Sequence, residues 1–147
     1  DYPSEADECR IIEATTSPKT SVIERVLAGP ELIAMQRLVL QVPAADYIIK
    51  YAAKLARLTR PGDGAPDFIA KYVSWGAGPR AGQSLILASK ARALLHGRPY
   101  VALEDIKAVA APVLRHRIIT NYNAEADRVK VDDLVTRLIA QLPRDAA

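Results

Sequence analysis

Residues 75–85 read WGAGPRAGQSL and place an arginine, Arg80, in the first turn of a predicted helix. Gly78 and Pro79 make a good helix start, because proline at the first helical position has no N–H to leave unpaired. A cation there is disfavoured by about 0.3–1 kcal/mol, since the first turn carries partial positive charge. Arg80 is therefore either a tolerated, solvated side chain or part of an anion site. A phosphate at this point would meet the helix dipole, N–H donors and a guanidinium together.

The helix that begins at Pro79 is the longest uninterrupted helical pattern in the chain. It extends to His96, and Gly97 follows as its stop. Five apolar residues at helical spacing are expected to form its buried face. They are Leu87, Ala88, Ala91, Leu94 and Leu95.

Apolar residues at helical spacing predict further helices along the chain. These cover residues 3–14, 30–42, 43–60, 68–75, 104–114 and 131–142. Ser4, with Asp7 three residues further on, is expected to cap the first of them. Pro112 should kink its helix or end it early. Residues 21–27 predict a short extended segment, 60–66 a loop, and 115–129 either a continued helix or a loop. The predicted fold class is all-α, a compact helical bundle.

The composition indicates one domain over residues 1–147, with enough hydrophobic residues, 50%, to bury a core. A net charge of +3 from 20 basic and 17 acidic residues does not by itself imply nucleic acid. Cys9 is the single cysteine, which excludes an internal disulfide and favours a reducing compartment. No apolar run approaches the roughly 20 residues that span a bilayer. We therefore expect a cytoplasmic protein.

The motifs of autonomous nucleotide hydrolysis are absent from the sequence. None of the seven glycines belongs to a G-x-x-x-x-G-K-[ST] loop, and no apolar run ends in Asp-Glu. The chain is therefore not expected to hydrolyse ATP by itself. Cys9, His96 and His116 lack metal-ligand spacing, so no metal site is predicted. No serine stands in a nucleophile elbow.

The run GAGPRAGQSLILASKARALLHGRPYVALEDIKAVAAPVLRHRI, residues 76–118, resembles the C-terminal lid domain of MoxR-family AAA+ ATPases. YPSEADE at 2–8 and the helix predicted over 43–60, ending in T-R-P, are similar to the same lid. The resemblance covers almost the whole chain, and its G-A-x-P-R-A and L-R-H-R pieces are specific when they occur together. It implies a helical bundle of the AAA+ lid type.

The resemblance also implies roles for particular residues. It makes GAGPR the sensor-2 motif and Arg80 the sensor-2 arginine, which reaches the γ-phosphate of ATP. Gly78, Pro79 and Ala81 would lie beside Arg80 at the nucleotide. ATP and Mg²⁺ would be held mainly by an upstream ATPase core, to which residues 1–20 form the junction. The implied function is a lid that couples hydrolysis to motion in a chaperone-like assembly or maturation machine acting on an unidentified client protein.

The L-R-H-R piece and Trp75 each leave two interpretations open. By the resemblance, Arg115, His116 and Arg117 contact the ATPase core or a neighbouring subunit of a ring, expected to be a hexamer. The alternative is a solvated basic helix end that complements the helix dipole. Trp75 is expected to fill the core, and the alternative places it beside the nucleotide.

The sequence departs from the family pattern at two helix starts. Gly78 stands where the family usually has serine, which weakens the cap. Ala102 and Leu103 stand where the family commonly has Thr-Pro, so that helix lacks its side-chain cap. Glu104 and Asp105 still suit the dipole there.

A second hypothesis is a stand-alone helical module that binds nucleic acid or protein. Its basic patch would consist of Lys107, Arg115 and Arg117. This module would bind DNA tightly and with a strong salt dependence. The small net charge and an aromatic content of 5% argue against it.

Overall fold

The computed structural model describes residues 2–18 and 23–143. Contacts along the chain divide it into two units, Asp1–Leu32 and Ile33–Ala147. Helix α2 (Gly29–Gln41) crosses the boundary between them.

The first unit contains helix α1 (Glu5–Thr16), and its predicted cap is confirmed. The Ser4 hydroxyl oxygen accepts a hydrogen bond from the Asp7 N–H at 3.3 Å, and the hydroxyl donates to the Asp7 carboxylate at 2.6 Å. Residues 23–27 of the predicted extended segment form neither helix nor strand. Residues 21 and 22 of that segment, and 19 and 20 of the expected junction, lie outside the described residues.

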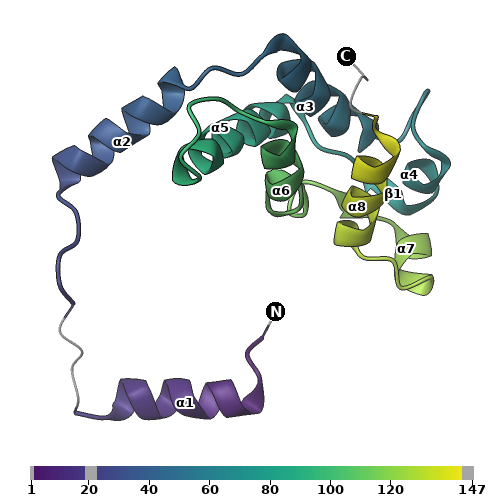
Figure 1. Ribbon diagram of the computed structural model, residues 1–147. Helices are drawn as coiled ribbons and strands as arrows, with labels where there is room; N and C mark the ends of the chain where they lie inside the picture. The colour runs from purple at the N-terminus through teal and green to yellow at the C-terminus, as the bar shows by residue number, and fades with distance from the viewer. Residues whose placement is uncertain (1, 19–22, 144–147) are drawn as a thin grey trace. The chain divides into compact units, whose positions relative to one another are not determined.

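The second unit is a helical bundle built on α3 (Asp46–Leu58), α5 (Pro79–Leu95), α6 (Leu103–Leu114) and α8 (Val131–Gln141). Helix α5 packs on α3 and α6, and α8 packs on the same two helices (Figure 1). Large apolar side chains, all fully buried, form the core between them. They include Ile48, Leu55, Leu85, Ile106, Leu114, Leu134 and Leu138. The all-α prediction is confirmed, with one short two-stranded ribbon added.

The buried face of α5 differs from the predicted one. Every fourth residue is buried, namely Ala81, Leu85, Ser89 and Ala93. Leu87 is 45% exposed and Leu95 86% exposed, so the prediction that they line the core is wrong. Apolar residues occur on more than one side of α5, so their spacing alone does not single out the inner face. Three of the four residues on that face, Ala81, Ser89 and Ala93, are small and let neighbouring helices approach closely. The predicted stop is confirmed at Gly97, which has a φ of +68°.

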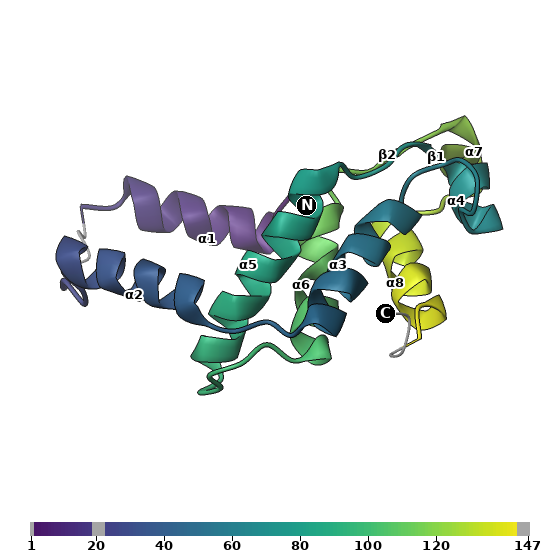
Figure 2. The same ribbon diagram turned by 90° about the horizontal axis from the view of Figure 1, so that it is seen from above.

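The helix predicted over 68–75 is divided into two elements. Helix α4 (Asp67–Tyr72) ends before strand β1 (Val73–Trp75), which pairs antiparallel with β2 (Ile119–Thr120). Strand β2 lies more than 40 residues further along the chain, so local periodicity could not reveal the pairing. Figure 2 shows this ribbon with α4 and α7 at one end of the second unit.

The ambiguous residues 115–129 form a turn, strand β2 and the short helix α7 (Tyr122–Ala126). The side chain of Asn121 caps α7 by accepting from the Ala124 N–H at 3.3 Å. Helix α6 continues through Pro112 to Leu114, so it does not end early.

In the described ranges 2–18 and 23–143, no single helix has the length and apolar character to cross a membrane. Helices α2 and α3 meet that test of length and composition only as a pair, across a bend of 97°.

Candidate functional site

The GAGPR motif connects strand β1 to helix α5. Gly78 is the N-cap of α5, with φ −78° and ψ −179°, and makes no side-chain capping bond. Pro79 is the first helical residue, as predicted. Arg80 is exposed, and in the described part of the chain no hydrogen bond or ion pair engages its guanidinium. The arginine at the helix start therefore carries its charge into solvent.

The backbone just before this arginine is fixed to the end of α3. The Ala77 N–H donates to Thr59 Oγ1 at 2.8 Å, and Arg60 Nε donates to the Ala77 carbonyl at 2.8 Å. Gly76 makes a close approach here, because a Cβ on it would lie 2.4 Å from the Thr59 carbonyl oxygen. No residue larger than glycine fits at position 76 without moving backbone.

The four residues predicted to lie at the nucleotide have different surroundings. Gly78, Pro79 and Arg80 are exposed, whereas Ala81 is fully buried. The Ala81 N–H donates to the Gly78 carbonyl at 3.0 Å within the first turn. The structure thus gives Ala81 a packing role and presents the Arg80 side chain outward.

Trp75 does not fill the core: its side chain is 70% exposed, and that prediction is wrong. A register irregularity between Val73 and Trp75 breaks the alternation that would have placed both on the buried side of the strand. Trp75 instead lines an open depression of about 540 Å³ together with Arg60, Gly78 and Pro79.

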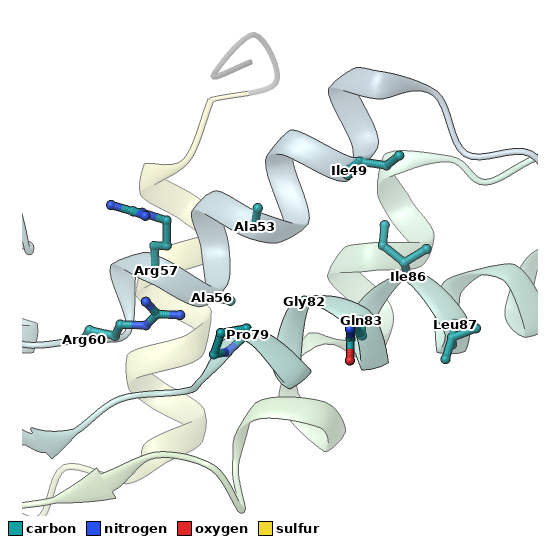
Figure 3. Close-up of a pocket in the computed structure, with 10 residues that line it drawn as sticks. All are labelled: Ile49, Ala53, Ala56, Arg57, Arg60, Pro79, Gly82, Gln83, Ile86 and Leu87. Atoms are coloured by element: carbon teal, nitrogen blue, oxygen red, sulfur yellow. The ribbon is translucent and has the colours of Figure 1, made fainter.

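A second hollow, of about 720 Å³, is an apolar groove between α3 and α5. Figure 3 shows Arg57 and Arg60 at one end of this groove, near Pro79, and Ile49 and Leu87 toward the other. The small residues of the two helices, Ala53, Ala56 and Gly82, leave the groove hollow.

The arginines of the L-R-H-R piece make contacts within the second unit. Arg115 Nη2 lies 2.9 Å from a carboxylate oxygen of Asp132 at the start of α8, and both side chains are about half exposed. Arg117 donates to the Val113 carbonyl and to Ser84 Oγ at 3.3 Å, and it also contacts His116 Nε2. Arg115 and His116 remain exposed, and their proposed role at a subunit interface stays a prediction.

Sequence reasoning missed the partners of Asp105, the fully buried third residue of α6. Its carboxylate accepts from Arg92 at 2.7 Å, from Arg98 at 2.7 and 2.6 Å, and from the Ala102 N–H at 2.9 Å. The last bond is the carboxylate half of a capping box: it satisfies the N–H of the N-cap residue Ala102, while the half that a threonine side chain would supply stays absent. Hydrogen bonds from Arg98 above all hold the pKa of Asp105 well below its ordinary value, against the opposing effect of burial. The sequence indicated that Asp105 is an acid well placed for the dipole of α6, but it gave no sign that the side chain is buried.

Comparison with known proteins identifies the class. Residues 68–138 match the model of the AAA lid domain. The chain is 29% identical over 141 residues to "Chaperone MoxR1" of Mycobacterium tuberculosis, which covers 94% of this chain and 37% of that protein. It is 38% identical over 79 residues to "Protein MoxR" of Paracoccus denitrificans, or 53% of this chain and 23% of the relative. A candidate ATPase from Cytophaga hutchinsonii has a similar crystal structure, with a TM-score of 0.82 and 26% identity, over 97% of this chain and 44% of its own.

The bundle and this match define an AAA lid domain. The chain carries the lid of a MoxR-type AAA+ ATPase. It spans less than half the length of each of these relatives.

Proposed function

We propose that this chain is the nucleotide-sensing lid of its ATPase, with Arg80 as the sensor-2 arginine. Arg80 contacts the γ-phosphate of ATP, which binds with Mg²⁺ mainly to an ATPase core outside this sequence. The observation that supports this role is an exposed guanidinium in the first turn of α5 with no partner in residues 2–18 and 23–143. An unpaired arginine at the positive end of a helix is suited to an anion.

Arg80 has the chemistry that phosphate recognition requires. Its guanidinium stays charged and presents a planar set of donors that bind phosphate oxygens in a bidentate way. ATP supplies the phosphoryl group whose transfer to water is the reaction. Donors placed at its terminal oxygens stabilise charge that develops during transfer.

The same contact couples lid position to the nucleotide. While the γ-phosphate is present, Arg80 ties α5 to the nucleotide, and loss of that phosphate releases the lid to rotate. We propose that subunits of the whole ATPase form a ring, expected to be a hexamer, with Arg115, His116 and Arg117 facing the core or a neighbour. The relative named as a chaperone suggests a chaperone-like action on a client protein.

The test is an Arg80→Ala substitution in the ATPase that carries this chain. Turnover of ATP should fall at least about tenfold, because a transition-state contact is lost. Arg80→Lys should recover part of the loss, since it keeps the charge without the bidentate geometry.

Arg37→Ala is the matched control, because Arg37 is an exposed helical arginine of α2 outside the motif. It should leave turnover near the unmodified value. Turnover unchanged by Arg80→Ala would overturn the sensing role.

A further inference from the structure

We infer that Thr59 and Arg60, at the end of α3, are positioning residues that set the direction in which Arg80 leaves the bundle. This inference rests on the proposed role of Arg80. Figure 3 shows the Arg60 side chain extending from the end of α3 toward Pro79, at the start of α5. Thr59 and Arg60 directly follow the last residue of α3, whereas Arg80 lies on α5.

Both polar backbone groups of Ala77 are held by these two side chains. The Ala77 N–H donates to Thr59 Oγ1, and the Ala77 carbonyl accepts from Arg60 Nε, each at 2.8 Å. The Thr59 hydroxyl itself donates to the Ala56 carbonyl at 2.7 Å, which fixes the orientation of its lone pairs toward Ala77. Thr59 and Ala77 are both fully buried, so water does not compete for the bond between the Ala77 N–H and Thr59 Oγ1.

The motif needs such an external anchor because its own residues provide little restraint. Ala77 stands between Gly76 and Gly78, and glycine is the residue with the greatest backbone freedom. Gly78 is the N-cap of α5 and has no side chain, so the capping hydrogen bond that a serine would make to the first turn is missing. A phosphate contact tolerates displacements of only about 0.5 Å. The Thr59 and Arg60 bonds supply the restraint that the cap does not.

Gly76 contributes to the same anchoring of the motif on the end of α3. A Cβ at this position would lie 2.4 Å from the Thr59 carbonyl and 2.5 Å from Arg60 Cα. The absence of a side chain at Gly76 therefore lets the motif come close enough to α3 for both Ala77 bonds to form.

A double-mutant cycle on ATP turnover tests this inference in the ATPase that carries the chain. Thr59→Val keeps the shape of the side chain and removes the hydroxyl, and it should lower turnover at least fivefold at saturating ATP. Thr59→Ser should restore turnover, because it keeps the hydroxyl. If Thr59 acts through Arg80, then Thr59→Val should cause no further loss in an Arg80→Ala background.

Arg60→Met provides a second, independent variant, since it keeps most of the aliphatic stem and removes the Nε donor. Arg60 is only partly buried, so this variant tests the inference even if Thr59→Val fails to fold. It should also lower turnover in the unmodified background and cause no further loss in the Arg80→Ala background.

The cycle separates this inference from the proposed function. If Arg80→Ala alone leaves turnover unchanged, the sensing role fails. If Arg80→Ala lowers turnover but the losses caused by Thr59→Val and Arg60→Met are equally large with and without Arg80, the two residues support the fold and do not position Arg80. Unchanged turnover in both variants overturns the inference as well.

Discussion

Two arginine sites of the second unit differ in where their charge is used. Arg92 and Arg98 form ion pairs with the buried carboxylate of Asp105. The Arg92 side chain is 31% exposed and the Arg98 side chain 27% exposed. Arg80 lies exposed at the other end of α5, without a partner among the described residues. An arginine whose charge is paired with a buried carboxylate contributes to folding. An arginine without such a partner is available to bind a ligand. Substitutions at the first site should therefore change stability, and those at Arg80 should change turnover.

Asp105→Asn should have the largest effect on stability. The amide cannot neutralise the two arginines, and removing one partner of a buried ion pair leaves the others uncompensated. We expect a loss of about 3 kcal/mol in the free energy of unfolding, the lower end for buried pairs because both arginines are partly exposed. This corresponds to a fall of about 10 °C in melting temperature, measured by thermal and urea unfolding of the 147-residue chain.

Asp132→Asn is the matched control for that experiment. It also removes a carboxylate paired with an arginine, Arg115, but its side chain is 49% exposed. Exposed pairs contribute about 0–1 kcal/mol, so this variant should melt close to the unmodified chain. Equal losses from Asp105→Asn and Asp132→Asn would show that burial does not distinguish the two sites.

Gly76→Ala should rank second. The added Cβ meets backbone atoms of Thr59 and Arg60, which cannot rotate away as a side chain could. The expected cost is about 2 kcal/mol by chain melting, typical of overpacking. In Gly82→Ala, the control in α5, the new methyl group meets no atom within 4 Å. That variant should be neutral or more stable, because alanine favours helix by up to about 1 kcal/mol.

The pH dependence of stability should show part of the Asp105 contribution. The pKa of Asp105 is lowered in the folded chain from its ordinary value of 3.8, so folding favours the ionised form. Its stabilisation is complete above the pKa of the unfolded chain and is lost as the pH falls toward the folded one. The stability gap between the unmodified chain and Asp105→Asn should therefore narrow from about pH 5 to about pH 3 in urea unfolding. A gap independent of pH would contradict this assignment.

The sequence predicted features that depend on neighbouring residues. The helical stripes of α3 and α8, the Ser4 cap and the Gly97 stop all follow from local spacing, and the structure has them. It also indicated an exposed arginine at a helix start.

Features that depend on distant residues were not predictable in this way. The exposure of Trp75 follows from a strand irregularity opposite Ile119, and the burial of Asp105 follows from arginines on α5 and in the next loop. The hydrogen bond from the Ala77 N–H to Thr59 Oγ1 joins residues that are 18 positions apart in the sequence. Each of these needs a tertiary contact that overrides or completes the local pattern.

Arg80→Glu should have the smallest effect on stability and gives the sharpest contrast with Asp105→Asn. An acid in the first turn of α5 interacts favourably with the helix dipole, so the chain should gain about 0.5 kcal/mol in unfolding free energy. The same charge reversal should abolish the proposed phosphate contact and lower ATP turnover in the whole ATPase below that of Arg80→Ala. A variant that is more stable and less active is the signature of a residue kept for a ligand at a cost to the fold. If Arg80→Glu instead destabilises the chain, Arg80 contributes to folding, and the contrast with Asp105 does not hold.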